Sequence, residues 1–218
     1  MFVGHYGPAF AVKGAVPRLP LWILFFAVQW MDVCWAILVL AGVEKLRIVP
    51  GFAAASNLDL YYMPYTHSLP GSLALSVLLG GIVAWFYRQA RGRVFLAVAL
   101  AVFSHWILDL IVHVPDLPLY DNSTKVGFGL WRYLWPSQMV EFAVLIGGAF
   151  YYDHVLPSAR TRGGVALWAF VAFLIGVQLY NAFTPASGST SGFAYTALAA
   201  YLGLTALAAL VDRARRPA

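Results

Sequence analysis

The sequence is poor in charge and in cysteine. Only 11% of its 218 residues are charged, against roughly 25% in an ordinary soluble domain, while 61% are hydrophobic and the mean hydropathy is +0.75. One core cannot hide so much apolar surface, so this composition excludes a water-soluble globule and predicts a polytopic membrane protein. The single cysteine, Cys34, excludes a disulfide framework and a thiolate zinc site. Any metal must therefore be held by imidazole and carboxylate groups.

Apolar stretches recur along the chain and predict an all-α, polytopic transmembrane helical bundle. We expect about six full spans, each near the ~20 residues that a bilayer requires. They run over residues 21–42, 72–88, 94–114, 137–156, 165–183 and 193–211. The N-terminal segment has no basic start or cleavage site of a signal peptide, so it is expected to remain as a further membrane-embedded helix. The prediction is a single integral membrane domain (1–218), in which 1–156 carries the candidate site and 157–218 adds two transmembrane helices.

The cations predict the orientation of the bundle. They form no basic stripe, so no nucleic-acid partner is expected. Short cytoplasmic loops of membrane proteins are rich in Lys and Arg. One face of the predicted bundle has ten cations, namely Lys13, Arg18, Arg88, Arg91, Arg93, Arg160, Arg162, Arg213, Arg215 and Arg216. The opposite face has four, namely Lys45, Arg47, Lys125 and Arg132. The C-terminus is therefore predicted to be cytoplasmic, with loops 44–70 and 115–136 on the outer side.

Several titratable side chains are predicted to lie at one depth inside the bilayer. Such groups are costly to bury, so each marks a candidate functional site. A cationic turn at residues 17–20 separates the N-terminal segment from the first span. At ~1.5 Å per residue, His5 and Asp32 each lie ~18 Å from this turn. Arg93 stands at the start of the third span. His105 is twelve residues beyond Arg93 and so reaches the same depth.

The most specific motif is HWILDLIVH in the third span. It places His105, Asp109 and His113 at intervals of four residues, which drift only ~40° per step around a helix and so form one stripe. Imidazole and carboxylate groups suit zinc or another divalent ion. His67 stands at the outer mouth of the second span. The candidate metal ligands are therefore His5, Asp32, His67, His105 and Asp109.

Other residues near the outer mouth are candidates for catalysis. Glu141 or Asp116 is a candidate general base, and His113 is either a further ligand or a proton shuttle. Arg132 is either a group that orients an anion or an ordinary interfacial arginine. A nucleophilic Ser68 lacks a base that the sequence can place.

Several segments together resemble the YdjM-like membrane-bound metal-dependent hydrolases of bacteria. They are HYGPAFAVK at the start, the mid-span Asp32, PYTHSL, SHWILDLIVHVPDLPL and GFGLW, which cover approximately the first two thirds of the chain. That family is distantly similar to zinc-dependent phospholipases C and single-strand nucleases. The resemblance implies one or more divalent ions, zinc above all, in the inner membrane of a bacterium, with the five candidate ligands as the metal-binding residues. Many relatives have His-Arg-Pro-Asp where this chain has HVPD at residues 113–116, so a basic residue of that pattern is missing.

The expected function is a membrane-embedded metal-dependent hydrolase. A site at this depth that opens towards the outer face favours a lipid or another amphiphilic ester or phosphoester as substrate. One alternative is a proton- or metal-coupled transporter, which needs polar groups on both sides of the bilayer midplane. Another is a non-catalytic metal-binding protein, which predicts a closed coordination site. The sequence leaves the oligomeric state open.

Overall fold

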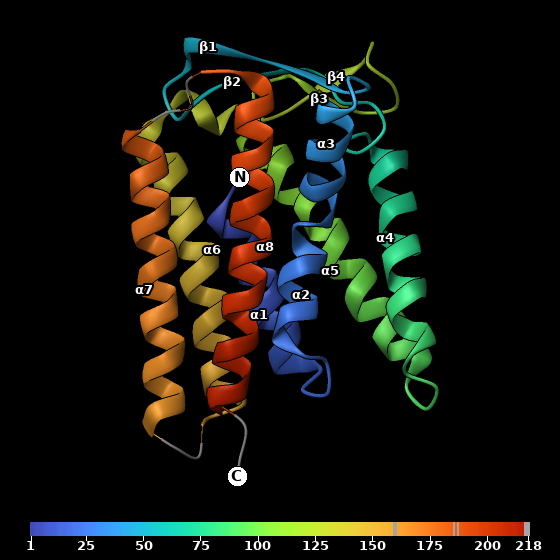
Figure 1. The fold of residues 1–218 in the computed structure, drawn as a ribbon, viewed down its shortest axis with the longest axis vertical. Coiled ribbons are helices and arrows are strands. Elements are labelled where there is room, and N and C mark those ends of the chain that lie inside the picture. Colours follow the sequence, from blue (N-terminus) through green and yellow to red (C-terminus); the bar gives the residue numbers. More distant parts are fainter. Residues whose placement is uncertain (159–160, 185, 187, 216–218) are drawn as a thin grey trace.

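The computed structural model describes residues 1–158, 161–184, 186 and 188–215, and most of them are helical (Figure 1). The helices are α1 (Tyr6–Ala15), α2 (Leu21–Val28), α3 (Trp30–Leu40), α4 (Leu69–Trp85), α5 (Arg91–Val112), α6 (Leu134–Val155), α7 (Thr161–Phe183) and α8 (Thr190–Arg215), with short 3₁₀ turns η1 (Val3–His5) and η2 (Leu130–Arg132). The predicted helical architecture is confirmed at this level. The chain is not entirely helical, however, because the segments predicted as loops 44–70 and 115–136 contain strands.

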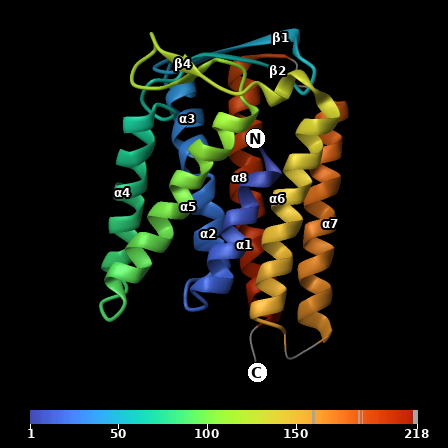
Figure 2. The ribbon, with the colours of Figure 1, turned by 180° about the vertical axis from the view of Figure 1, so that it is seen from behind.

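Two small antiparallel sheets replace what the sequence presented as polar loops. Strand β1 (Lys45–Ala53) pairs with β2 (Ser56–Tyr62), and β3 (Leu117–Pro118) pairs with β4 (Lys125–Val126). Both sheets lie at one end of the helical bundle in Figures 1 and 2. The backbone N–H of Ala55 donates to the carbonyl of Trp131 at 2.9 Å, which joins the β1–β2 hairpin to η2. The hairpin therefore covers one end of the bundle.

The prediction of six full spans is not supported. Among the described residues, α5, α7 and α8 are long and apolar enough to cross a membrane, and a fourth span is added if the bent pair α2 and α3 counts as one. Helix α4 has 17 residues, which rise only ~26 Å against a hydrocarbon core of ~30 Å. Helix α6 has 22 residues, but it carries Gln138, Glu141 and Asp153. The apolar helices indicate a membrane protein with fewer clear spans than expected.

The first predicted span, residues 21–42, is a broken helix. Helices α2 and α3 meet at Gln29 with a bend of 51° between them. Gln29 is fully buried, and its side-chain amide donates to the carbonyl of Phe2 at 3.4 Å. A break at membrane depth is tolerated where the protein satisfies the freed backbone groups. The bend also places Asp32 in the first turn of α3, where the partial positive charge of a helix N-terminus favours a carboxylate.

Helix α1 lies inside the bundle and packs against α6 (Figure 2). The two helices cross closely at Gly7 and Gly148, since a Cβ on Gly148 would overlap the Gly7 carbonyl and a Cβ on Gly7 would overlap the backbone of Val144. Small residues permit such close approach of membrane helices. The enclosed α1 carries η1, and with it His5, into the middle of the molecule.

The end of the bundle opposite the sheets holds the C-terminal end of α8, at Arg215, and turns rich in cations (Figure 1). Of the ten cations predicted for this face, Arg160 and Arg216 lie outside the described residues. Buried Lys13 pairs with Asp212 of α8 at 2.9 Å, and Arg215 pairs with Asp153 of α6 at 2.8 Å. These ion pairs join α1, α6 and α8 at this end. The assignment of this end to the cytoplasm stays a prediction.

Candidate metal centre

Three side chains from η1 and α5 form a first buried group. Nε2 of His5 lies 3.2 Å from Oδ1 of Asp109, and Nε2 of His105 lies 3.1 Å from Oδ2 of the same carboxylate. The rings of His5 and His105 stack with their centroids 3.7 Å apart. One potential ligand atom from each of the three residues lies within 4.8 Å of the others, a spacing that can hold a metal ion.

A second group shares His105 and adds residues from α3 and from the segment before α4. Nε2 of His67 lies 3.3 Å from Oδ1 of Asp32, and Nε2 of His105 lies 3.5 Å from the same oxygen. These three residues also place their ligand atoms within 4.8 Å of one another. His67 lies 3.8 Å from Oδ2 of Asp109, which connects the two groups. The structure thus brings together all five residues that were predicted as ligands.

Three of the histidines, His67, His105 and His113, are oriented by hydrogen bonds at Nδ1. His105 Nδ1 lies 2.6 Å from the carbonyl of Val28, the group freed by the break between α2 and α3. A carbonyl can only accept, so His105 carries its proton on Nδ1 and leaves Nε2 as a free donor of electrons. This is the tautomer that a metal ion requires at Nε2.

His67 is oriented by a relay to a buried carboxylate. The Thr66 hydroxyl donates to Oε2 of Glu44 at 2.6 Å and lies 2.8 Å from His67 Nδ1. Because that hydroxyl has one proton, which points to Glu44, it accepts from His67 Nδ1. Glu44 also accepts the backbone N–H groups of Tyr65 and Thr66. In the neutral ring, this relay leaves Nε2 of His67 as the nitrogen without a proton, and Nε2 faces Asp32.

His113 has the same arrangement at the C-terminal end of α5. Its Nδ1 donates to Oδ1 of Asp116 at 2.9 Å, and its Nε2 lies 3.6 Å from Oδ2 of Asp109. The ring stacks at a tilt on Trp131, with the centroids 4.1 Å apart. The stripe predicted from HWILDLIVH therefore presents His105, Asp109 and His113 to one space.

The donor set fits a divalent cation. Within the described part of the chain, Nδ1 of His5 has no partner, and Nε2 of His5 and Nε2 of His105 make no hydrogen bond and face only the carboxylates of Asp109 and Asp32, although both histidines are almost completely buried. Buried polar atoms without partners are costly. A cation accepts their electron pairs and offsets the charges of Asp32 and Asp109.

Glu141, a candidate general base, lines the cavity and has both carboxylate oxygens engaged by backbone N–H groups. Its two carboxylate oxygens accept the backbone N–H of Phe2 at 2.9 and 3.2 Å and that of Gly4 at 2.7 Å. Those contacts occupy the carboxylate with the segment that carries His5. The amino group of Met1 lies 2.7 Å from Oδ1 of Asp109, so it too reaches the centre of the site.

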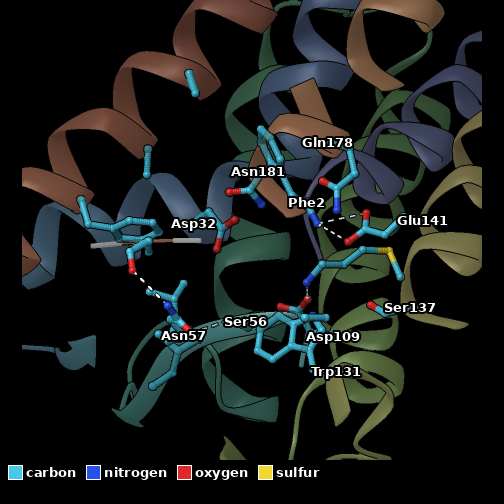
Figure 3. A pocket seen from close by; sticks show the side chains of 18 of the residues that line it. Phe2, Asp32, Ser56, Asn57, Asp109, Trp131, Ser137, Glu141, Gln178 and Asn181 are labelled. Carbon is cyan, nitrogen blue, oxygen red and sulfur yellow. Dashed lines mark hydrogen bonds and ion pairs between the residues drawn. The ribbon is translucent and has the colours of Figure 1, made fainter. Parts of the chain in front are cut away.

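A cavity of about 310 Å³ opens beside the two groups. Figure 3 shows Asp32, Asp109 and Glu141 around it together with polar side chains of α6 and α7. His67, His113 and Tyr201 also line it, and Tyr201 interacts with Asp32. The candidate ligands therefore border a space that can admit a second molecule.

Asp116 and Arg132 line a separate cavity of about 470 Å³. Lys125 lies there too and donates to the carbonyls of Tyr61 and Asp116 at 2.9 and 3.1 Å. Burial lowers the pKa of Lys125 below its usual value, while nearby Asp116 and Asp59 act in the opposite direction. Asp116 has its connection to the candidate ligands through His113, which lies between Asp116 and Asp109.

Sequence reasoning missed several residues that shape the site. Glu44 and Thr66 lie 22 residues apart, and only the fold of the hairpin between them brings the pair to His67. Ser68 caps α4, since its Oγ accepts the N–H of Gly71 at 3.1 Å, which accounts for its place beside His67. Cys34 is free and half-buried on α3.

Comparisons with protein families, with curated proteins and with solved structures find no match to this chain.

Proposed function

We propose that this chain is a membrane-embedded hydrolase that uses a divalent metal, zinc in the first place, to cleave an ester or phosphoester bond of a lipid or another amphiphile. The observation that carries the proposal is the set of His67, His105 and His113, whose Nδ1 atoms have oxygen partners while their Nε2 atoms face Asp32 and Asp109 beside a cavity. Such outer partners are typical of metal-ligating histidines. The resemblance of the sequence motifs to YdjM-like hydrolases supports the same reading.

The chain's own residues divide the work. His5, His105 and Asp109 form one half of the ligand set, and Asp32 and His67 complete the other, with His105 common to both. One or two ions held there supply Lewis-acid chemistry, because a divalent ion lowers the pKa of a water ligand towards ~7 and polarises a carbonyl or phosphoryl oxygen.

His113 is the proposed acceptor of the proton that the attacking water loses. It lines the cavity, its Nδ1 donates to Asp116, which leaves Nε2 as the free nitrogen of the neutral ring, and Asp116 stabilises the ring when Nε2 takes up a proton. Glu141 acts as a positioning residue, because it holds the backbone of Phe2 and Gly4 and so fixes His5.

Two features favour hydrolysis over the alternatives. A layer of buried rings from Tyr6, Phe10, Phe25, Tyr152 and Phe170 fills the bundle between the site and the end with the C-terminus. A transporter requires a polar route through that region. The cavity beside the ligands argues against a purely structural metal site, which is coordinatively closed.

The proposed location is the inner membrane of a bacterium, with the site towards the outer face and the C-terminus in the cytoplasm. The clustering of the described cations at the end opposite the sheets supports this orientation. A lipid substrate would then approach from the outer leaflet.

Metal analysis tests the proposal. Protein purified without chelators should contain at least one divalent ion per chain, and His105→Ala and Asp109→Ala should lose it. His154→Ala is the matched control, since this exposed histidine lies at the other end of α6. Wild-type protein without stoichiometric metal would refute the proposal. Lipid hydrolysis that continues in the presence of a chelator would refute the mechanism even if metal were found.

A further inference from the structure

Part of the cavity wall consists of uncharged polar side chains that the proposed metal chemistry does not use. Ser137 and Gln138 come from α6, and Gln178 and Asn181 come from α7 (Figure 3). Ser137 and Gln178 are only 1% and 3% exposed. Burying such groups is costly unless they form hydrogen bonds.

Two atoms of this wall lack a partner. Nε2 of Gln178 donates to Oε1 of Gln138 at 2.9 Å, which fixes the orientation of the Gln178 amide. Oε1 of Gln178 and Oγ of Ser137 have no hydrogen-bond partner among the residues that the structure describes. Both residues line the cavity, so a molecule inside it can satisfy them.

The hydrogen-bonding capacity of these two atoms favours a ligand that can donate a hydrogen bond. An amide oxygen only accepts, whereas a serine hydroxyl both donates and accepts. A hydroxyl-bearing group meets both requirements, and a quaternary ammonium has no N–H to give. Along the described lining of the cavity there is no Lys or Arg, so this wall offers no side-chain cation to a phosphate.

The mouth of the cavity lies on the flank of the bundle. Tyr180 and Asn181 of α7 and Thr196 of α8 are exposed at its edge, with Tyr180 71% exposed. Both helices are long and apolar enough to cross a membrane. Ala197 and Ala200 of α8 also line the cavity, so small apolar side chains form this part of its wall.

We propose that the cavity binds an amphiphile whose headgroup ends in an uncharged, hydroxyl-bearing alcohol of glycerol or sugar type, which enters between α7 and α8 and places hydroxyl groups against Gln178 and Ser137. This inference rests on the proposed function for the position of the scissile bond beside the metal ligands. It adds the class of headgroup that the enzyme selects.

Lipid binding to the full chain tests the inference. Native mass spectrometry in detergent micelles, with chelator present to prevent cleavage, compares dioleoyl phosphatidylglycerol with dioleoyl phosphatidylmethanol. Both are anionic phosphodiesters with the same acyl chains, and only the first has headgroup hydroxyls. We expect wild-type protein to prefer phosphatidylglycerol about tenfold, the loss expected when one buried hydrogen-bonding atom is left without its partner.

Gln178→Leu and Ser137→Ala should each reduce this preference, and Gln89→Leu, at an exposed glutamine in the turn before α5, should keep it. If Gln178→Leu fails to fold, Ser137→Ala still carries the test. Equal binding of the two lipids by wild type, or a preference that both variants retain, would overturn the inference. A stronger preference for dioleoyl phosphatidylethanolamine would also overturn it, in favour of an ammonium headgroup. Because the readout is binding to chelated protein, failure of hydrolysis alone leaves the headgroup preference standing.

Discussion

Replacing Thr66 by Val isolates the relay behind His67. Valine has nearly the same shape as threonine but cannot accept from His67 Nδ1 or donate to Glu44. Glu44 keeps the backbone N–H groups at positions 65 and 66, at 2.8 and 3.0 Å, so the local fold should persist. Nδ1 of His67 and Oε2 of Glu44 lose the hydroxyl that they share, so the orientation and tautomer of His67 lose their support.

The expected effect is a weakening of metal affinity by about 10–100-fold, as for other outer partners of metal ligands. This corresponds to about 1.4–2.7 kcal/mol of binding free energy. The group of Asp32, His67 and His105 should weaken, while the group of His5, His105 and Asp109 has no contact with Thr66 in the described hydrogen bonds and ion pairs. If two ions bind, only one equivalent should become weaker.

The measurement is a competition titration of purified protein in detergent against a chelator of known zinc affinity. Thr184→Val, at an exposed position after α7, is the matched control and should titrate like wild type. Wild-type affinity in Thr66→Val would refute the assignment of Thr66 and Glu44 to the metal centre. Equal weakening of every equivalent would refute the separation into two groups.

Three further predictions concern the proton carrier and the packing. Asp116→Asn should lower hydrolysis ~10–100-fold at unchanged metal content, because it perturbs the tautomer of His113; loss of metal would instead make His113 a ligand. Gly148→Val should destabilise the protein by about 1–3 kcal/mol, since its side chain overlaps α1, and thermal unfolding followed by tryptophan fluorescence checks this. Lys13→Met should cost about 3–5 kcal/mol in chemical unfolding, and the double variant with Asp212→Leu should recover part of that loss. An unchanged unfolding midpoint in Lys13→Met would contradict the stabilising role of the pair.

The convergence of the candidate ligands was predictable because it depends on residue spacing along single helices, which the sequence shows directly. Helix rise fixes the depth of His5, Asp32 and His105 relative to the turns, and helix periodicity fixes the stripe through Asp109. The structure places those side chains within a few ångströms of one another. Their role as ligands stays a prediction until metal is measured.

The break at Gln29 could not be predicted from the sequence. The residues around it are mostly apolar, and no Gly or Pro interrupts them between Leu21 and Leu40. The bend is stabilised by tertiary contacts: Gln29 donates to the carbonyl of Phe2, just before η1, and the Val28 carbonyl accepts from His105 of α5. The sequence pattern therefore predicted one straight span where the protein has two short helices.

The relay and the cavity escaped prediction for a similar reason. Glu44 lies at the edge of a loop that the sequence presents as polar, and its partners at 65 and 66 follow only after the hairpin. Gln178 and Ser137 are single polar residues in apolar helices, and nothing in their spacing pairs α7 with α6. Such contacts depend on how distant segments pack.

Because the partner of His105 is the backbone carbonyl of Val28, the contact does not depend on the side chain at position 28. Every side chain at position 28 leaves that oxygen in place, so no ordinary substitution there removes the acceptor that orients His105. What removes it is a change that straightens the chain, because a continuous helix would turn the carbonyl back into an intrahelical hydrogen bond with the residue four positions on. Substitutions that repair the helix at Gln29 are therefore expected to stabilise this segment locally while they disable the site. Selection for stability alone is therefore expected to favour substitutions that straighten this bend and remove the acceptor of His105.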